Sequence, residues 1–234
     1  MAVRGMSEDD LVKMVQEDYS SSVTFQRPYF NKFINYYNLY RNYLDKKKIP
    51  WRANLFVPEA FSAVETVFPR LIAGKPKVEI IGRQIKDKEN AKWNQSIIDY
   101  QWDYCEIQES IKEWIKETLL YGTGLLKVTW DSEEDDVKVE PLDIFNFFFD
   151  PAGTLINKNM RYVIHKGHSN IYDLLKNPIY KNVKPLIKEL QSGKNNSGTD
   201  VSDQQRQRQY SLVPVAYKVD KESIDVLEWW GNLK

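Results

Sequence analysis

Hydrophobic residues recur at intervals of three and four positions over most of the first 120 residues, a spacing that places them on one face of an α-helix. The pattern predicts a helix that starts after Ser7, with acidic residues in its first turn, and a second helix over about 28–45. We expect the serine run 20–22 to separate the two. A third helix is predicted from Pro58 to about Leu71.

Two more helices are predicted over 87–121, with a break near 104–106. The first of these presents Trp93, Ile97, Ile98 and Trp102. Gly122 is well placed to end the second one in a left-handed conformation.

Short strands are expected in the remainder of the chain. They are predicted at 77–81, at 125–130 and 137–140 as a hairpin around an acidic turn, at 160–165, at 212–218 and at 224–229. The apolar segment 141–151 is bounded by prolines and is expected to be extended. Short helices are predicted over 169–176 and from Pro178 to about Leu190. The fold class is therefore α+β, mainly α, with small antiparallel β hairpins.

Domain organisation is predicted from the change in composition near residue 190. Residues 1–190 form a helical region with an embedded hairpin, and 210–234 begin a β-containing region. Between them, 191–209 holds a single aliphatic residue among Ser, Gly, Asn, Gln and charged residues, which is typical of a flexible linker.

Composition describes an ordinary globular chain, with 42% hydrophobic and 28% charged residues over 234 positions. Basic and acidic residues number 33 each, which argues against a protein that binds DNA through a global positive charge. The single Cys105 excludes an intrachain disulfide, and no apolar run reaches the ~20 residues that span a bilayer. With no secretory signal pattern either, we expect a soluble protein made inside the cell.

Aromatic residues are the unusual feature of the composition, with 7 Trp, 14 Tyr and 10 Phe. They favour an assembly component, and the alternative is a tyrosine-rich core. A broad aromatic stripe is expected on the helix over 28–45, at Tyr29, Phe30, Phe33, Tyr36, Tyr37, Tyr40 and Tyr43. It is interpreted as a packing surface, because a base-stacking platform is interleaved with basic residues and only Lys32 and Arg41 lie in the run.

Motifs for catalysis and cofactor binding are not found in the sequence. There is no Walker A pattern, and Gly122-x-Gly124 lies between a helix and a strand, where it is interpreted as a helix cap and turn. His165 and His168 supply two ligands of a possible metal site, too few for structural zinc, and are interpreted as a solvent-exposed pair at a strand end. Cys105 is expected to be a buried, unreactive thiol. The prediction is a non-enzymatic protein with no catalytic residues, cofactor or metal.

Four segments stand in order over about residues 50–176. They are Trp51–Glu59 leading into Ala63–Leu71, Tyr121–Gly124 followed by Leu126–Trp130, Val139–Phe145 ending at Phe149–Pro151, and Arg161–His165 followed by Ile171–Leu175. Together they resemble the portal protein, or head-to-tail connector, of tailed bacteriophages. This is the ring through which the genome enters and leaves the capsid.

The resemblance implies a structural subunit of a cyclic homo-oligomer, usually a dodecamer, made in the host cytoplasm and located at one capsid vertex of the virion. It implies partners: other copies of the chain, the major capsid and scaffolding proteins, the terminase large subunit, a head–tail adaptor, and double-stranded DNA that passes through without tight binding. No membrane partner is implied. In this view 1–190 is wing-like, 210–234 begins a clip-like region, and the sequence is expected to be an N-terminal part of a longer polypeptide.

Five aromatic residues are candidates for the subunit interface under this resemblance: Trp51, Phe61, Phe68, Tyr36 and Tyr40. The alternative is that they are ordinary core residues. No residue of a DNA channel is assigned. A rival function is a helical nucleic-acid-binding protein unrelated to the virion, which would use Lys46–Lys48 and the aromatic helix Tyr29–Tyr43. A third is an enzyme whose site the sequence does not reveal.

Overall fold

The computed structural model describes residues 7–43, 57–131, 135–153, 159–176, 180, 183 and 223–231. Within this part of the chain, five α-helices accompany two small antiparallel sheets, so the predicted α+β, mainly α class is confirmed. The chain divides into two compact units, one formed by 1–30 with 145–234 and the other by 31–144. The predicted linker 191–209, the helix from Pro178 to Leu190 and the strand 212–218 lie outside the described residues, apart from single positions.

Helix α1 (Glu8–Tyr40) is continuous, so the predicted break at the serine run is wrong. Ser7 caps its start by accepting a hydrogen bond from the N–H of Asp10, as the sequence predicts. Within the serine run, the Ser20 hydroxyl donates to the Glu17 carbonyl, which satisfies it inside the helix. Ser22 is fully buried and bonds to Tyr162, 140 residues away. This tertiary contact outweighs the weak local preference of serine for a helix end.

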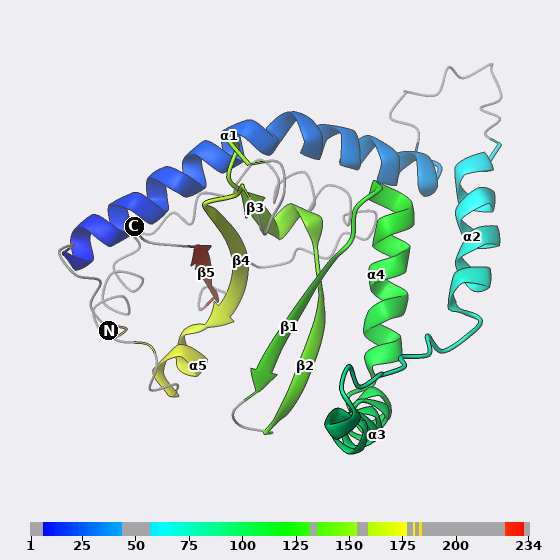
Figure 1. Ribbon diagram of the computed structural model, residues 1–234. Helices are drawn as coiled ribbons and strands as arrows, with labels where there is room; N and C mark the ends of the chain where they lie inside the picture. Colours follow the sequence, from blue (N-terminus) through cyan, green and yellow to red (C-terminus); the bar gives the residue numbers. More distant parts are fainter. Residues whose placement is uncertain are drawn as a thin grey trace. The chain divides into compact units, whose positions relative to one another are not determined.

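The first unit is a three-stranded antiparallel sheet with the first part of α1 on one face (Figure 1). The strand order is β3 (Phe147–Phe149), β4 (Tyr162–Asn170), β5 (Ser223–Gly231). Two more hydrogen bonds fix the helix to the sheet. The Tyr162 hydroxyl donates to the Asp18 carbonyl at 3.1 Å, and the Trp229 indole N–H donates to the Asp18 carboxylate at 3.1 Å.

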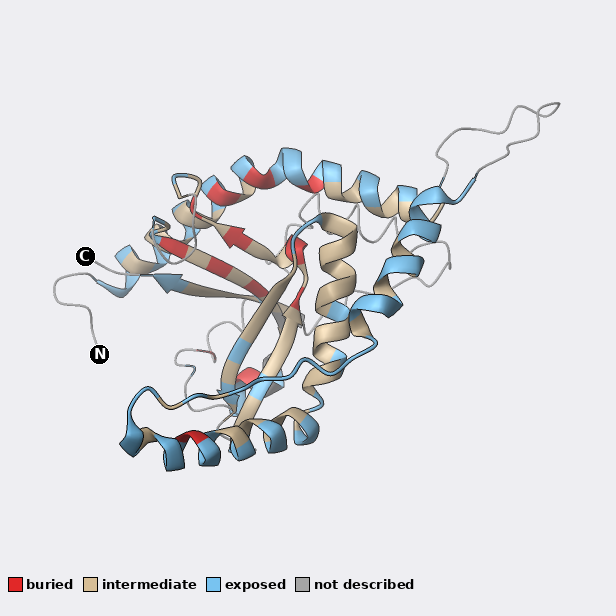
Figure 2. Cartoon of the chain, turned by 45° about the vertical axis from the view of Figure 1, so that its right-hand side comes forward, coloured by how far each residue is buried: buried red, intermediate tan, exposed pale blue. Residues whose placement is uncertain are grey.

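Several buried residues of this unit lie on α1 and on the strands of the sheet (Figure 2). Phe148 and Ile164 stand opposite each other on neighbouring strands and are almost inaccessible to solvent. The Phe148 ring meets Tyr19 and Phe30 of α1 edge to face, at centroid distances of 4.9 and 5.9 Å. The predicted strand at 160–165 is therefore confirmed and extends to Asn170, where α5 (Ile171–Lys176) follows as expected.

The apolar segment over 141–151 is only partly extended. Strand β2 continues to Leu142, a short 3₁₀ turn over Ile144–Asn146 follows, and β3 completes the segment. The turn places Phe145 against Phe30, with ring centroids 5.4 Å apart. The bend is therefore stabilised by core packing, which the proline-bounded sequence pattern does not reveal.

The second unit contains α2 (Glu59–Ile72), α3 (Lys88–Tyr104), α4 (Ile107–Tyr121) and the hairpin of β1 (Leu125–Asp131) with β2 (Asp136–Leu142). All five predictions are confirmed, and the break between α3 and α4 has Glu106 in the left-handed region at φ 48°. The predicted strand at 77–81 is wrong. No strand pairs with it in the described chain; instead the Gln95 side chain of α3 accepts from the Ile80 N–H and donates to the Val78 carbonyl.

Gly122 and Gly124 provide a matched pair for testing why glycine stands at each position. Gly122 has φ 76° and open space where a Cβ would lie, so Gly122→Ala should cost only the left-handed strain of about 1 kcal/mol. At Gly124 a Cβ would lie 2.2 Å from Thr118 Oγ1 and 2.7 Å from the Trp114 carbonyl oxygen. Gly124→Ala should therefore cost about 2–3 kcal/mol, because α4 must shift. Urea unfolding of both variants measures the difference, and equal losses would contradict the close approach at Gly124.

Candidate functional site

Three of the five candidate interface residues meet in one place within the second unit. The ring of Tyr40, at the end of α1, lies 5.4 Å from the ring of Phe61 on α2. The Lys116 ammonium of α4 stands 5.8 Å from the Tyr40 ring centroid and 5.6 Å from that of Phe68. We call Tyr40, Phe61, Phe68, Glu65 and Lys116 the aromatic cluster; it joins three helices through the faces that periodicity assigns to packing.

A polar network completes the aromatic cluster. The Tyr40 hydroxyl donates to Glu65 Oε1, and Lys116 Nζ lies 3.5 Å from the same oxygen. Burial, followed by the bond to Glu65, raises the pKa of Tyr40, and the hydrogen bond from Tyr40 lowers the pKa of Glu65. Both shifts move the pKa values further from neutral pH. The cluster therefore keeps a neutral phenol and an ionised carboxylate, which suits a fixed contact rather than proton transfer.

The other two candidate interface residues are placed differently. Tyr36 is 46% exposed on the outer side of α1, and Trp51 lies outside the described residues, as does Lys46–Lys48. The aromatic stripe predicted on this helix therefore has two sides. Phe30, Phe33, Tyr37 and Tyr40 turn toward the packed side, whereas Tyr29, Tyr36 and Tyr43 remain exposed.

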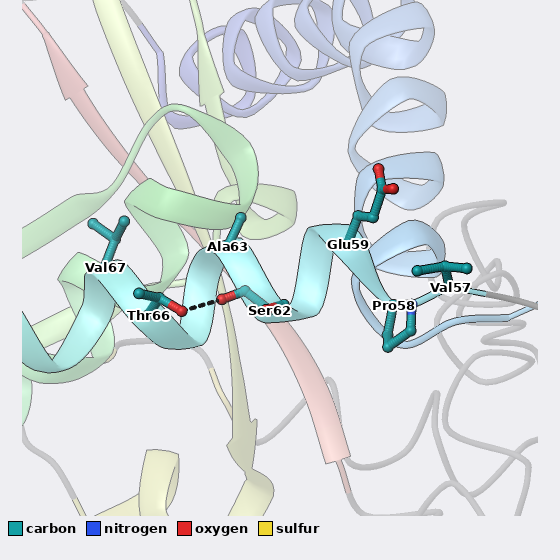
Figure 3. A pocket seen from close by; sticks show the side chains of 7 residues that line it. All are labelled: Val57, Pro58, Glu59, Ser62, Ala63, Thr66 and Val67. Carbon is teal, nitrogen blue, oxygen red and sulfur yellow. Dashed lines mark hydrogen bonds between the residues drawn. The ribbon is translucent and has the colours of Figure 1, made fainter.

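A shallow hollow of about 580 Å³ runs along the side of α2 (Figure 3). Its lining residues come from this helix and the two residues before it: Val57, Pro58, Glu59, Ser62, Ala63, Thr66 and Val67. The Thr66 hydroxyl is occupied by a bond to the Ser62 carbonyl at 2.6 Å. Small and apolar side chains with one carboxylate do not form a constellation for chemistry, and they fit contact with another surface better.

Helix α3 has two apolar sides, and the four residues predicted as one set, Trp93, Ile97, Ile98 and Trp102, are divided between them. Ala91 is buried and Ile98 and Trp102 are half-buried, on the side that carries Gln95. The opposite side carries Trp93, Ile97, Tyr100 and Tyr104, which are 51–71% exposed. Tyr100 and Tyr104 stack at 5.4 Å with an interplanar angle of 13°. The signal was present in the sequence as a second set of residues spaced four, three and four apart.

The most tightly organised charge of the first unit is Asp150, just after β3. Its carboxylate is fully buried and accepts from Arg161 Nε at 2.7 Å and Nη2 at 3.1 Å, and from the backbone N–H groups of Ala152 and Arg161. The Arg161 hydrogen bonds lower the pKa of Asp150 to about 2. Every bond is local to the connection between β3 and β4, so this is a structural clamp.

The two histidines were predicted to lie at a strand end. This prediction is wrong, because β4 continues past both. His165 is half-buried, and its Nδ1 lies 3.3 Å from Glu228 Oε2 on the neighbouring strand. The backbone of His168 pairs with Asp225. Cys105 is half-buried rather than fully buried as predicted, and this burial, followed by the nearby Asp136, raises the pKa of its thiol.

Among the residues that the structure describes, no group of three or more His, Cys, Asp or Glu side chains is placed to hold a metal ion. Within the same residues, no helix combines the length and the apolarity needed to cross a bilayer. Compared with known proteins, the sequence matches no protein-family model and has no significant match among curated proteins.

Proposed function

We propose that this chain is a structural subunit of a bacteriophage portal ring, the channel for packaging and ejection of double-stranded DNA at one capsid vertex. The proposal starts from the four ordered segments that resemble portal proteins. Its partners would be other copies of the chain, the capsid and scaffolding proteins, the terminase large subunit and a head–tail adaptor. The chain would act without a cofactor and without catalysis.

The single observation that carries the proposal is the exposed apolar surface of the second unit. Large apolar side chains stay exposed on α3, on the outer side of α1 and on the hairpin, where Val128 and Trp130 are more than half exposed. Soluble monomers rarely expose contiguous apolar patches of this kind, and Trp and Tyr are the residues that dominate protein interfaces. A ring subunit, which contacts a neighbour on each side, accounts for several such surfaces on one chain.

Local structure within the resembling segments supports the same proposal. Residues 59–71 form α2, and 121–130 form the end of α4, the glycine turn and β1. The third and fourth segments meet at the clamp, where Asp150 binds Arg161. The described parts of these segments are therefore ordered structural elements, and the third and fourth are joined by a specific ion pair.

The test is the assembly state of the full chain, by native mass spectrometry and negative-stain electron microscopy. We expect closed rings with a central hole. A monodisperse monomer with native helix content would contradict the proposal, unless added scaffolding or capsid protein restored rings. Alanine replacement of Lys46–Lys48 tests the rival in the same preparation. Nucleic-acid binding by those lysines predicts a large loss of DNA affinity and a shallower salt dependence, whereas the portal proposal predicts little change.

A further inference from the structure

The exposed side of α3 has the geometry of a helix-pairing seam. Trp93, Ile97, Tyr100 and Tyr104 are spaced four, three and four residues apart, which places them in one straight row along the helix. We call this row the α3 stripe. It is about 16 Å long at a rise of 1.5 Å per residue. Because the opposite side of α3 already packs against its own chain, the α3 stripe is left for a partner.

A matching row lies on the outer side of α1, also within the 31–144 unit. Lys32, Tyr36 and Leu39 are spaced four and three apart and are all exposed, and the exposed Tyr43 follows just after the helix ends. We call this the α1 stripe. The spacing of four and three matches Trp93, Ile97 and Tyr100 in the forward direction and Tyr104, Tyr100 and Ile97 in the reverse direction. Spacing alone therefore permits a parallel or an antiparallel pair.

Charge selects the direction. The first half of α3 carries Lys88, Glu89 and Lys92, whereas its second half carries Asp99 and Asp103 and no basic residue. Helix α1 has no acidic residue between Tyr19 and Tyr40, and Lys32 lies in its stripe. An antiparallel pair places Lys32 beside Tyr104 and the acidic end of α3, whereas a parallel pair places it beside the mixed charges of Glu89 and Lys92. Antiparallel packing also opposes the two helix dipoles favourably.

The carboxylates at that end of α3 remain available to a partner. Asp103 pairs with Lys75 at 2.7 Å, yet its side chain is 76% exposed. Surface ion pairs of this kind are weak and leave the local field negative. Asp99 accepts from the Gln95 amide at 3.3 Å and stays exposed.

We propose that the α3 stripe of one copy packs antiparallel against the α1 stripe of the next copy, with Tyr100 opposite Tyr36, Ile97 opposite Leu39 and Tyr104 opposite Lys32. The contact joins two different surfaces, and when it is repeated head to tail from copy to copy it can close as the ring that the proposed function requires. In this respect the inference rests on the proposed function. The seam is shorter than a standard interface needs, so other surfaces contribute to each junction.

Cysteine cross-linking between copies tests the register. With the native thiol removed by Cys105→Ser, the full chain carrying Lys32→Cys is co-expressed with a differently tagged copy carrying Tyr104→Cys, and the pair is oxidised. We expect a cross-link that contains both tags. The matched control replaces Tyr104→Cys with Trp93→Cys, the position that Lys32 would face in a parallel pair, and no cross-link is expected.

A second measurement tests the contribution of the stripe itself. Tyr100→Glu should weaken self-association at least about tenfold, because it places a charge at the centre of the seam. Asn94→Glu adds the same charge to the same helix, at an exposed position outside the stripe, and should leave assembly unchanged. Circular dichroism confirms that both variants keep their helix content.

The outcomes separate this inference from the proposed function. Rings without the Lys32–Tyr104 cross-link, or with the Lys32–Trp93 cross-link in its place, would overturn the seam and leave the portal proposal standing. Equal assembly of Tyr100→Glu and Asn94→Glu would also overturn the seam. A folded monomer at all concentrations, with scaffolding and capsid protein added as well, would overturn both.

Discussion

Phe148→Ala is expected to lower the free energy of unfolding by about 3–4 kcal/mol, the largest effect of any single substitution considered. Phe148 is 2% exposed and stands opposite Ile164 in the centre of the three-stranded sheet. Its ring contacts Tyr19 and Phe30, so the removal of the ring leaves a cavity where α1 meets the sheet. The surrounding strands can close this cavity only in part. Urea unfolding followed by far-UV circular dichroism measures the loss.

The control for this prediction is Trp230→Ala in the same unit. Trp230 is a larger residue but is 53% exposed, and it lies on the opposite face of the sheet from Phe148 and Ile164. Its truncation should cost less than about 1 kcal/mol. A loss for Phe148→Ala as small as that for Trp230→Ala would mean that α1 does not cover this face of the sheet in solution.

The local sequence pattern was sufficient to predict those elements that are determined by residues close together in the sequence. The spacing of apolar residues predicted α2, α3, α4 and the hairpin, and Gly122 marked the end of α4 because only a left-handed residue closes that turn. These features depend on residues within one or two turns of each other. No information from distant parts of the chain was needed to place them.

Errors arose where a distant partner decides the local structure. The serine run was predicted to end a helix, but Ser22 is held inside α1 by Tyr162 of β4. Residues 77–81 have the composition of a strand, but the amide of Gln95 supplies their hydrogen bonds instead of a neighbouring strand. Neither Tyr162 nor Gln95 carries a mark in the sequence that identifies its partner.

The candidate interface residues illustrate how far sequence can go toward the site. Aromatic content pointed to contact surfaces, and the structure brings Tyr40, Phe61 and Phe68 to a single cluster within the chain. Which aromatic residue faces a neighbour depends on which side of each helix its own chain covers. For this reason the sequence prediction grouped Trp93 and Ile97 of the α3 stripe with Ile98 and Trp102 of the packed side, since a helix with two apolar sides gives no sign of which side is packed.

Asp150→Ala is expected to cost about 2–3 kcal/mol of folding free energy. The buried carboxylate accepts two backbone N–H groups and both arms of the Arg161 fork, and alanine leaves those backbone donors without their acceptor. The loss stays below that of a fully buried ion pair because the Arg161 side chain is 69% exposed and can be solvated by water. Chemical unfolding at neutral pH measures it. The control is Glu140→Gln, which breaks the half-exposed pair with Lys138 and should cost less than about 0.5 kcal/mol.

The acid dependence of unfolding gives Asp150 a signature that a simple packing role would not produce. Its pKa is about 2 in the folded chain and near 3.8 when the chain is unfolded, so the unfolded state binds the proton more tightly. The stabilisation is therefore complete above about pH 5 and is lost as the pH falls toward 2, an effect of about 1–2 kcal/mol once exposure of Arg161 is considered.

Asp150→Asn removes this titration while keeping the shape of the side chain. Because every other carboxylate titrates in both proteins, the difference in stability between wild type and Asp150→Asn should shrink steadily below pH 4. A difference that is constant from pH 7 to pH 2 would show that the Asp150 charge does not hold the β3–β4 connection.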